Sequence, residues 1–258
     1  MARVTSISSR SNPLLVRLRK LASESSGYRK SGTVLLEGEH LCAAWCARNG
    51  ATPQAVVSES GWATRRLREL ASTAVDVAVV ADDAMAGLGT LESPAAIVFV
   101  IDAPAALSLR PREPTLVLDR VQDPGNVGSM LRSAAAFGIV QVIALVGTAA
   151  LWSPKVVRAG MGAHFALHLI EGADEDQLAA LELPLFGTSP HAADRIDTAA
   201  LQWPCGWVLG HEGQGISAAV AARCTAMLAI SQPGGEESLN VAAAAAVCVH
   251  ESARRRRP

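Results

Sequence analysis

At 258 residues the chain is long enough for one large domain or two ordinary ones, and half of its residues are hydrophobic. A net charge of −1 argues against a generally basic nucleic-acid binder, and no apolar run reaches the roughly 18 residues that a membrane span requires. The N-terminus has no apolar signal-peptide core, and the five scattered cysteines indicate reduced thiols, so we expect a cytoplasmic protein with no membrane partner.

The charge is unevenly distributed along the chain. Residues 1–75 carry eleven basic and five acidic side chains, a balance of +6, whereas the remainder carries twelve and nineteen, a balance of −7. A basic N-terminal third suggests an anionic partner at that end. The alternative is that Arg17, Arg19 and Lys20 line an ordinary solvated helix face, and charge alone leaves both interpretations open.

A leucine pattern predicts the first helix. It begins at Asn12–Pro13, a pairing typical of a helix start, and its leucines recur on one face. Short apolar runs then alternate with helical patterns as far as Ile101, which indicates a small α/β domain. The expected strands cover 32–38, 55–58, 75–80 and 95–101, and the expected helices cover 39–48 and 62–71.

The segment 102–114 contains three prolines and is the best candidate for a linker. We therefore predict one domain over 1–104 and a second over 113–258. Apolar strands that alternate with helices indicate a parallel sheet covered on both faces, with ligands bound beyond the carboxyl ends of the strands. The second domain's expected strands cover 115–118, 140–146, 166–170, 185–188, 206–209 and 226–230, and its expected helices cover 128–137, 154–161, 174–181, 217–223 and 240–254.

Three polar, glycine-rich corners follow strands of this second domain. The first covers 119–128 and leads into a helix that carries Arg132. The second covers 209–217 and surrounds Glu212 with three glycines, and the third covers 230–241 and opens the last helix. Glycine permits close backbone approach, and a helix N-terminus offers free N–H groups to an anion or a carbonyl. Each corner alone could be an ordinary strand-to-helix turn, but the three together can converge on one pocket.

The order and content of these corners resemble the three motifs of the SpoU/TrmH family of RNA ribose 2′-O-methyltransferases, within the SPOUT superfamily. The resemblance covers about 114–252, and three ordered motifs make it specific. The residues that carry it are Asn126, Gly128, Arg132, Ala136, Phe137, Gly138, Leu209, Gly210, Glu212, Gly213, Gly215, Ser238, Leu239, Asn240, Val241 and Glu251, together with the intervening Lys155, Arg158, Gly160 and 162–165.

The resemblance implies an enzyme that transfers a methyl group from S-adenosylmethionine to a ribose 2′-hydroxyl. The catalytic candidates are Arg132, Asn126, Glu212, Ser238 and Asn240. The cofactor candidates, which would meet adenosylmethionine largely through backbone groups, are Thr188, Leu209, Gly210, Gly213, Ile230, Ser238 and Leu239. Because arginine keeps its proton far above neutral pH, phosphate positioning and alkoxide stabilisation fit Arg132 better than base catalysis, although both roles stay open.

The resemblance also implies a fold and an assembly. The C-terminal parallel-sheet domain would contain a deep trefoil knot and form a homodimer, and small side chains at 242–246 fit close packing of the last helix in either setting. Through 11–13, the leucine-rich helix and 35–38, the N-terminal part is similar to a small ribosomal-protein-like α/β domain that grips RNA. Its RNA-binding candidates are Arg10, Asn12, Arg17, Arg19, Lys20, Arg29 and Lys30.

Three positions depart from the family pattern. Ala242 replaces a frequent serine, Ser231 replaces a frequent proline, and His250 replaces a frequent aromatic residue, so details of the pocket differ. None of these changes removes a catalytic candidate, and catalytic competence is the interpretation that we favour. No metal site is expected, because His164 and His168 have no carboxylate partner at metal-binding spacing.

Ribosomal RNA is favoured over transfer RNA as the substrate, because minimal transfer-RNA enzymes of the family often lack the N-terminal domain. The alternatives are a transfer-RNA 2′-O-methyltransferase and a non-catalytic RNA-binding or ribosome-assembly protein. A nucleotide-dependent α/β enzyme is disfavoured, since the chain has neither a phosphate-binding lysine loop nor the dinucleotide-binding glycine spacing. The target nucleotide, a housekeeping or antibiotic-resistance role, and the function of the arginine-rich tail at 254–257 are not determined by the sequence.

Overall fold

The computed structural model describes residues 2–50, 52–88, 94–234 and 239–256. The chain divides into two compact units. The first comprises Met1–Ala105 together with Trp152–Phe165, and the second comprises Ala106–Leu151 together with Ala166–Pro258. The segment Trp152–Phe165, which falls inside the second predicted domain, packs in the first unit because α8 (Pro154–Gly160) lies against the strand β2 (Thr33–Glu37) of that unit.

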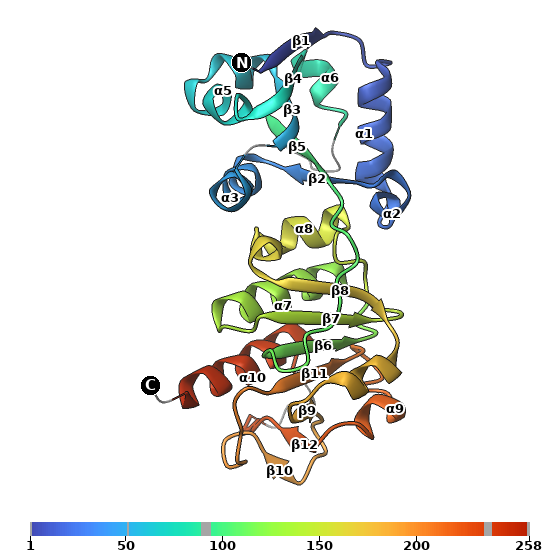
Figure 1. Ribbon diagram of the computed structural model, residues 1–258, viewed down its shortest axis with the longest axis vertical. Helices are drawn as coiled ribbons and strands as arrows, with labels where there is room; N and C mark the ends of the chain where they lie inside the picture. The colour runs from blue at the N-terminus through green and yellow to red at the C-terminus, as the bar shows by residue number, and fades with distance from the viewer. Residues whose placement is uncertain (1, 51, 89–93, 235–238, 257–258) are drawn as a thin grey trace. The chain divides into compact units, whose positions relative to one another are not determined.

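The first unit is built on a five-stranded mixed sheet with the order β1-β4-β3-β5-β2 (Figure 1). β1, β4 and β3 run parallel, whereas β5 is antiparallel to both β3 and β2. The strands are β1 (Arg3–Ile7), β2 (Thr33–Glu37), β3 (Thr52–Ser58), β4 (Ala74–Val80) and β5 (Ile97–Asp102). β1 was not predicted, because only Val4 and Ile7 of its five residues are apolar.

Short helices connect these strands. Asn12 caps the first helix by accepting from the Leu14 N–H at 2.9 Å, and Leu15, Leu18 and Leu21 are buried, as the leucine pattern predicts. The predicted helix at 62–71 is two short helices instead, which meet at Thr64. The helices are α1 (Pro13–Ser23), α2 (Gly27–Ser31), α3 (Glu39–Asn49), α4 (Glu59–Ala63), α5 (Arg65–Ala71), α6 (Asp82–Met85) and α8, followed by the 3₁₀ helix η1 (Ala163–Ala166).

The second unit contains a seven-stranded sheet with the order β10-β12-β9-β11-β6-β7-β8. Every neighbouring pair in it is parallel, which confirms the predicted parallel sheet. The strands are β6 (Thr115–Asp119), β7 (Gln141–Leu145), β8 (His168–Ala173), β9 (Leu185–Thr188), β10 (Asp194–Arg195), β11 (Gly206–Gly210) and β12 (Ala226–Ala229).

Helices cover both faces of this sheet. On one face, Val117 and Val208 join a core with Leu178 of the 3₁₀ helix η2 (Glu175–Ala180) and Val220 of α9 (Ala218–Ala221). The neighbouring Trp207 points the other way, and its indole N–H donates to Ser252 of α10 (Val241–Arg255) at 2.8 Å. α10 packs against α7 (Pro124–Ala136). An α-helix predicted at 174–181 is instead η2, a length at which the tighter 3₁₀ turn is common.

The register aligns the carboxyl ends of the central strands. Gly210 pairs with Asp119 across β11 and β6, and Thr188 pairs with Leu228 across β9 and β12. The loops that follow these strands therefore leave the sheet at one edge, where parallel sheets bind ligands. Within the described residues, no helix is both long enough and apolar enough to cross a membrane.

Candidate active site

The first corner is a strained turn followed by a capped helix. β6 ends at Asp119, and Arg120 adopts a left-handed backbone with φ of 59°. The Asp123 carboxylate accepts from the Asn126 N–H at 2.7 Å, and Pro124 occupies the first helical position. This cap starts α7 and places the Asn126 side chain at the mouth of the helix.

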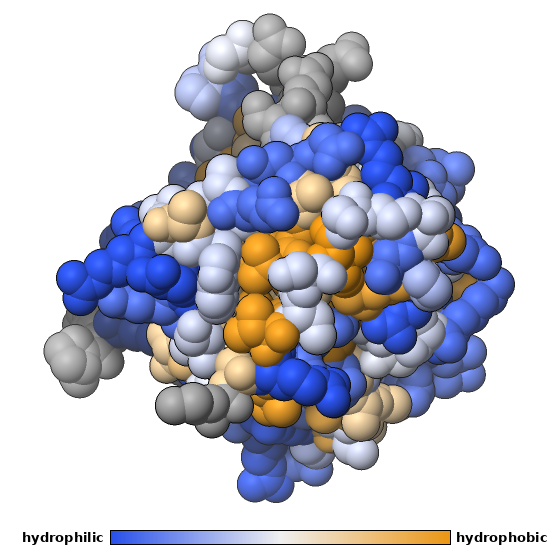
Figure 2. Space-filling model, turned by 90° about the horizontal axis from the view of Figure 1, so that it is seen from above, coloured by the Kyte–Doolittle hydropathy of each residue, from blue (hydrophilic) through white to orange (hydrophobic). Residues whose placement is uncertain are grey.

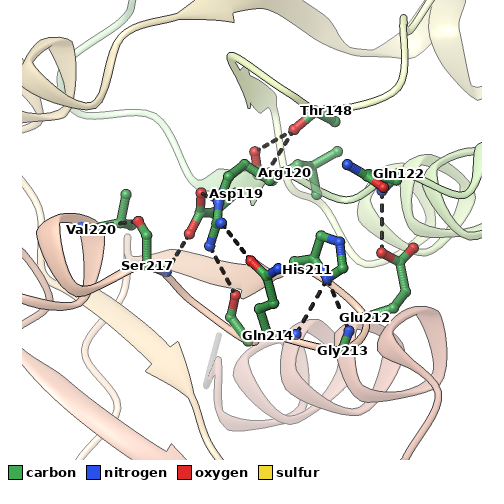
Figure 3. Close-up of polar contacts among 12 residues, drawn as sticks. Asp119, Arg120, Gln122, Thr148, His211, Glu212, Gly213, Gln214, Ser217 and Val220 are labelled. Atoms are coloured by element: carbon green, nitrogen blue, oxygen red, sulfur yellow. Dashed lines mark hydrogen bonds and ion pairs between the residues drawn. The ribbon is translucent and has the colours of Figure 1, made fainter.

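The second corner is a loop closed on itself. His211 and Gly215 exchange backbone hydrogen bonds of 3.0 and 2.8 Å. The His211 Nδ1 accepts from the N–H groups of Gly213 and Gln214 at 3.0 and 3.3 Å, so the other ring nitrogen carries the proton (Figure 3). A Cβ at Gly210 would lie 2.2 Å from the backbone carbon of Gly215, so only glycine fits where the loop folds back over β11.

Glu212 joins the second corner to the first. Its carboxylate accepts from the N–H groups of Gln122 at 3.2 Å and Asp123 at 3.1 Å, and from the Asn126 side-chain amide at 3.1 Å. Burial raises the pKa of this carboxyl, but the hydrogen bonds to the charged form outweigh burial and leave the pKa below its ordinary value. Glu212 is therefore a fixed anion that holds the first corner in place.

Asn240 joins the third corner to the other two. Its side-chain oxygen caps α10 by accepting from Ala242 at 2.9 Å and Ala243 at 3.2 Å. Its amide nitrogen donates to the Asn126 oxygen at 3.0 Å, and Asn126 donates onward to Glu212. This chain of hydrogen bonds determines the orientation of both amides and connects all three corners.

The other predicted catalytic residues lie apart from this chain. Arg132 projects from the exposed face of α7 and has no hydrogen bond or ion pair to another described residue. Ser238 lies outside the described residues. The structure thus brings Asn126, Glu212 and Asn240 together and leaves Arg132 free to meet a ligand.

The predicted cofactor residues lie along the aligned strand ends. Thr188 and Ile230 are half-buried at the ends of β9 and β12, and the Thr188 hydroxyl donates to the Val208 carbonyl at 3.5 Å. Leu209 is buried in the sheet, so only its backbone can face a ligand, whereas Gly213 and Leu239 are exposed. Gly210 is the last residue of β11.

Four residues of this region were not named as site candidates from the sequence: Asp119 and Arg120 after β6, Thr148 after β7, and His211 after β11. Asp119 is a buried carboxylate at the end of an apolar strand, and that position was the available signal. Arg120 and Thr148 gave none, because their partners lie far away in the sequence.

The predicted RNA-binding residues all belong to the first unit. Most are exposed, but Arg19 is half-buried and donates to the Leu15 carbonyl at 3.2 Å, and Asn12 is engaged in its helix cap. The guanidinium of Arg29 lies 5.6 Å from the centre of the Tyr28 ring.

In the view from above, strongly hydrophilic residues surround a smaller hydrophobic area (Figure 2). Among the described residues, no group of three or more His, Cys, Asp or Glu side chains could hold a metal ion.

The comparisons with known proteins decide the family. Residues 113–250 match the model of the SpoU rRNA Methylase family. The chain belongs to this family. It is 30% identical over 224 residues to the 23S rRNA (guanosine(2553)-2′-O)-methyltransferase RlmP of Bacillus subtilis, covering 86% of this chain and 88% of RlmP. It is also 30% identical to the 23S rRNA (guanosine-2′-O-)-methyltransferase RlmB of Bordetella pertussis over 217 residues, covering 79% of this chain and 84% of that protein.

Solved structures agree with this SpoU assignment. A TrmH-family protein from Porphyromonas gingivalis superposes with a TM-score of 0.83 at 32% identity, covering 95% of this chain and 99% of that one. The SpoU methyltransferase AviRb of Streptomyces viridochromogenes, solved in complex with AdoMet, shares the fold with a TM-score of 0.85 at 24% identity, covering 95% and 98% of the two chains. Both neighbours span both units, so the likeness is not restricted to the SpoU segment.

Proposed function

We propose that this protein is an S-adenosylmethionine-dependent methyltransferase that methylates a ribose 2′-hydroxyl in ribosomal RNA. The observation that carries the proposal is the hydrogen-bonded chain from Asn240 through Asn126 to Glu212, which joins the three SpoU motifs at one edge of the sheet. The names of RlmP and RlmB, which cover most of this chain, support the reaction and the ribosomal substrate.

The strand ends of the second unit fit adenosylmethionine. Thr188 and Gly210 end β9 and β11, and Ile230 directly follows the adjacent strand β12. Leu239, further along the chain, presents an exposed apolar side chain. Backbone groups at these positions, with Leu209, Gly213 and Ser238, would hold a ligand that has no phosphate. Adenosylmethionine supplies the methyl group on its sulfonium. The chain's part is to align the ribose oxygen with that methyl and to move its proton.

Arg132 is the residue that we propose for the reacting oxygen. A guanidinium keeps its proton near neutral pH, so it is better suited to bind an RNA phosphate and stabilise the developing alkoxide than to act as a base. Its exposed position on α7, without a partner among the described residues, supports a role toward the substrate. Asn126 and Asn240 hold the corners that flank the site.

We further propose the family's assembly for this chain. The α/β unit that carries Arg10, Arg17, Lys20 and Lys30 would grip RNA, since these side chains are exposed. The second unit would contain a deep trefoil knot and pair with a second copy. Small side chains on α10, which packs against α7 and β11, support both ideas. A ribosomal RNA substrate would place the protein in the cytoplasm.

A methyl-transfer assay tests the reaction. The full chain, incubated with methyl-tritiated adenosylmethionine, is expected to label unmodified ribosomal RNA in preference to transfer RNA. The labelled linkage should resist alkaline cleavage, because a 2′-O-methyl group blocks attack by that oxygen on the neighbouring phosphate. Label in a base would contradict the proposed reaction, and failure to label any RNA would favour the non-catalytic alternative.

The Arg132→Ala variant tests the assigned residue. Adenosylmethionine binding by calorimetry should be unchanged, whereas turnover should fall by roughly 100-fold, as for removal of one preorganised donor in other enzymes. Arg112→Ala is a matched control, because Arg112 is an exposed arginine of the same unit that pairs with Glu182. Full turnover in Arg132→Ala would exclude both the base and the phosphate role.

A further inference from the structure

Arg120 is held in an unusual backbone conformation. Among the described residues other than glycine, only Arg120 and Met161 have a positive φ. Such a conformation costs free energy and persists where surrounding contacts hold it in place, frequently at functional sites. Thr148 supplies those contacts, since its hydroxyl accepts from the Arg120 N–H at 3.1 Å and donates to the Leu118 carbonyl at 2.9 Å.

The left-handed turn directs the Arg120 side chain onto the second corner (Figure 3). Its guanidinium donates to the Gln214 side-chain oxygen at 3.0 Å and to the Gly215 carbonyl at 3.5 Å. It also donates to the Asp119 carboxylate at 3.0 Å. The guanidinium therefore binds the later part of the second corner, at Gln214 and Gly215.

Asp119 grips the end of the same loop. Its carboxylate, whose side chain is only 3% exposed, accepts from the Ser217 N–H at 2.6 Å. Ser217 in turn caps α9 by accepting from the Val220 N–H. The buried Asp119 thus connects the guanidinium of Arg120 to the start of the helix that follows the loop.

The two corners are fixed to each other from opposite directions. Glu212 reaches from the second corner to the backbone of the first, and Arg120 reaches from the first corner to the backbone of the second. The loop that both contacts hold begins with Gly210–Gly213, whose backbone is a wall of the proposed cofactor site. Charged hydrogen bonds at both ends would keep this backbone in one shape before any ligand arrives.

We propose that Asp119 and Arg120 are a positioning pair that holds the second-corner loop, 211–217, in the conformation that receives the cofactor. This inference rests on the proposed function. Neither residue needs to touch the ribose, and the pair acts through the loop. Its loss should therefore weaken adenosylmethionine binding without slowing methyl transfer once the cofactor is saturating.

The test compares Arg120→Met with wild type. Calorimetry should show adenosylmethionine affinity reduced by roughly tenfold, the effect of losing a charged hydrogen bond, and the KM for adenosylmethionine should rise in parallel. The kcat at saturating cofactor should stay within about threefold. Arg112→Met, which removes an exposed arginine that pairs with Glu182, should leave both constants unchanged.

A milder variant guards against misfolding. Gln214→Ala removes one acceptor and keeps the Arg120 side chain, and its effect on cofactor affinity should not add to that of Arg120→Met, since both break the same contact. Additive effects, or a fall in kcat at unchanged cofactor affinity, would overturn the positioning role. A wild-type protein that transfers no methyl group would instead refute the proposed function and leave the loop contacts to be explained otherwise.

Discussion

Glu37 in the first unit and Glu212 in the second both lie where a buried strand gives way to a glycine turn. The Glu37 side chain is 5% exposed, and its nearest charge is Arg158 at 3.8 Å. Neither of its oxygens has a hydrogen-bond partner among the described residues. Burial raises the pKa of Glu37, and Arg158 opposes that shift only in part, whereas the pKa of Glu212 is lowered.

The difference lies in the donors rather than in the charges. Glu212 forms no ion pair with an arginine of the described residues, yet three N–H groups from the first corner stabilise its ionised form. Glu37 has an arginine, but a guanidinium at 3.8 Å without a hydrogen bond does not replace lost water. A carboxylate therefore stays ionised and holds the neighbouring backbone in place when hydrogen-bond donors surround it.

Removal of the Glu212 carboxylate should have the largest effect. In Glu212→Ala three donors of the first corner lose their acceptor, so the charged hydrogen bonds that hold the first corner to the second are removed. We expect methyl transfer to fall by roughly 100-fold or more, as for loss of other preorganised hydrogen bonds. Steady-state methyl transfer at several adenosylmethionine concentrations measures the loss.

Glu212→Gln is the matched control for that change. Glutamine keeps one acceptor oxygen but turns an N–H group toward the donors, so its activity should lie between those of wild type and Glu212→Ala. If Glu212→Ala transferred methyl groups as well as wild type, the first corner would not depend on this carboxylate, and the rule drawn from the two glutamates would fail.

Arg254 and Arg255 at the end of α10 allow the same comparison for positive charges: one has many hydrogen-bond partners and the other has few. Arg255 is 23% exposed and donates to Glu251 and to the carbonyls of Ala199, Ile196 and Asp197. Arg254 is 60% exposed, and Glu251 is its one partner among the described residues. Arg255→Ala should lower the free energy of unfolding by about 2–3 kcal/mol, and Arg254→Ala by less than about 1 kcal/mol. Urea denaturation measures both, and equal losses would contradict the argument.

The contacts of Arg255 and Arg256 answer part of what the sequence left open about the arginine-rich tail. Arg255 binds backbone carbonyls, and Arg256 stacks over the Trp203 ring at 3.3 Å and donates to the Gly138 carbonyl at 3.2 Å. Neither residue is the simple solvated end that was one of the two interpretations. The partners lie on loops more than 50 residues away, so no local pattern could have revealed them.

The sequence predicted the parallel sheet of the second unit because continuous apolar strands alternate with helices. It also singled out Asn126, Glu212 and Asn240, through the resemblance of the three glycine-rich corners to the SpoU/TrmH motifs. The hydrogen bonds that join them span 86 and 114 residues and could be inferred only as convergence of the corners. The left-handed Arg120 was not predictable, since the conformation is rare for arginine and is imposed by Thr148.

The pH dependence of the unfolding free energy tests the role of Glu251. The pKa of Glu251 is lowered to about 2, first by its hydrogen bond from Arg254 and also by Arg255. A carboxyl whose folded pKa is depressed stabilises the fold above its ordinary pKa of 4.5, and this contribution is lost as pH falls toward about 2. Glu251→Gln should therefore flatten the loss of stability over that range. Urea denaturation at several pH values measures the slope, and an unchanged slope would contradict this assignment.

Glu37→Gln should have the smallest effect. A carboxyl with a raised folded pKa binds its proton more tightly in the folded state, so its destabilising contribution grows as pH rises from 4.5 through the folded pKa. The neutral amide of glutamine removes the cost of burying a charge, and Arg158 stays solvated because a third of its side chain is exposed. At neutral pH the variant should be as stable as wild type or more stable by up to about 1 kcal/mol. Urea denaturation at pH 4 and pH 7 is the measurement, with the exposed Glu69→Gln as control. A loss of more than about 2 kcal/mol at pH 7 would mean that the ion pair with Arg158 stabilises the fold despite its missing hydrogen bonds.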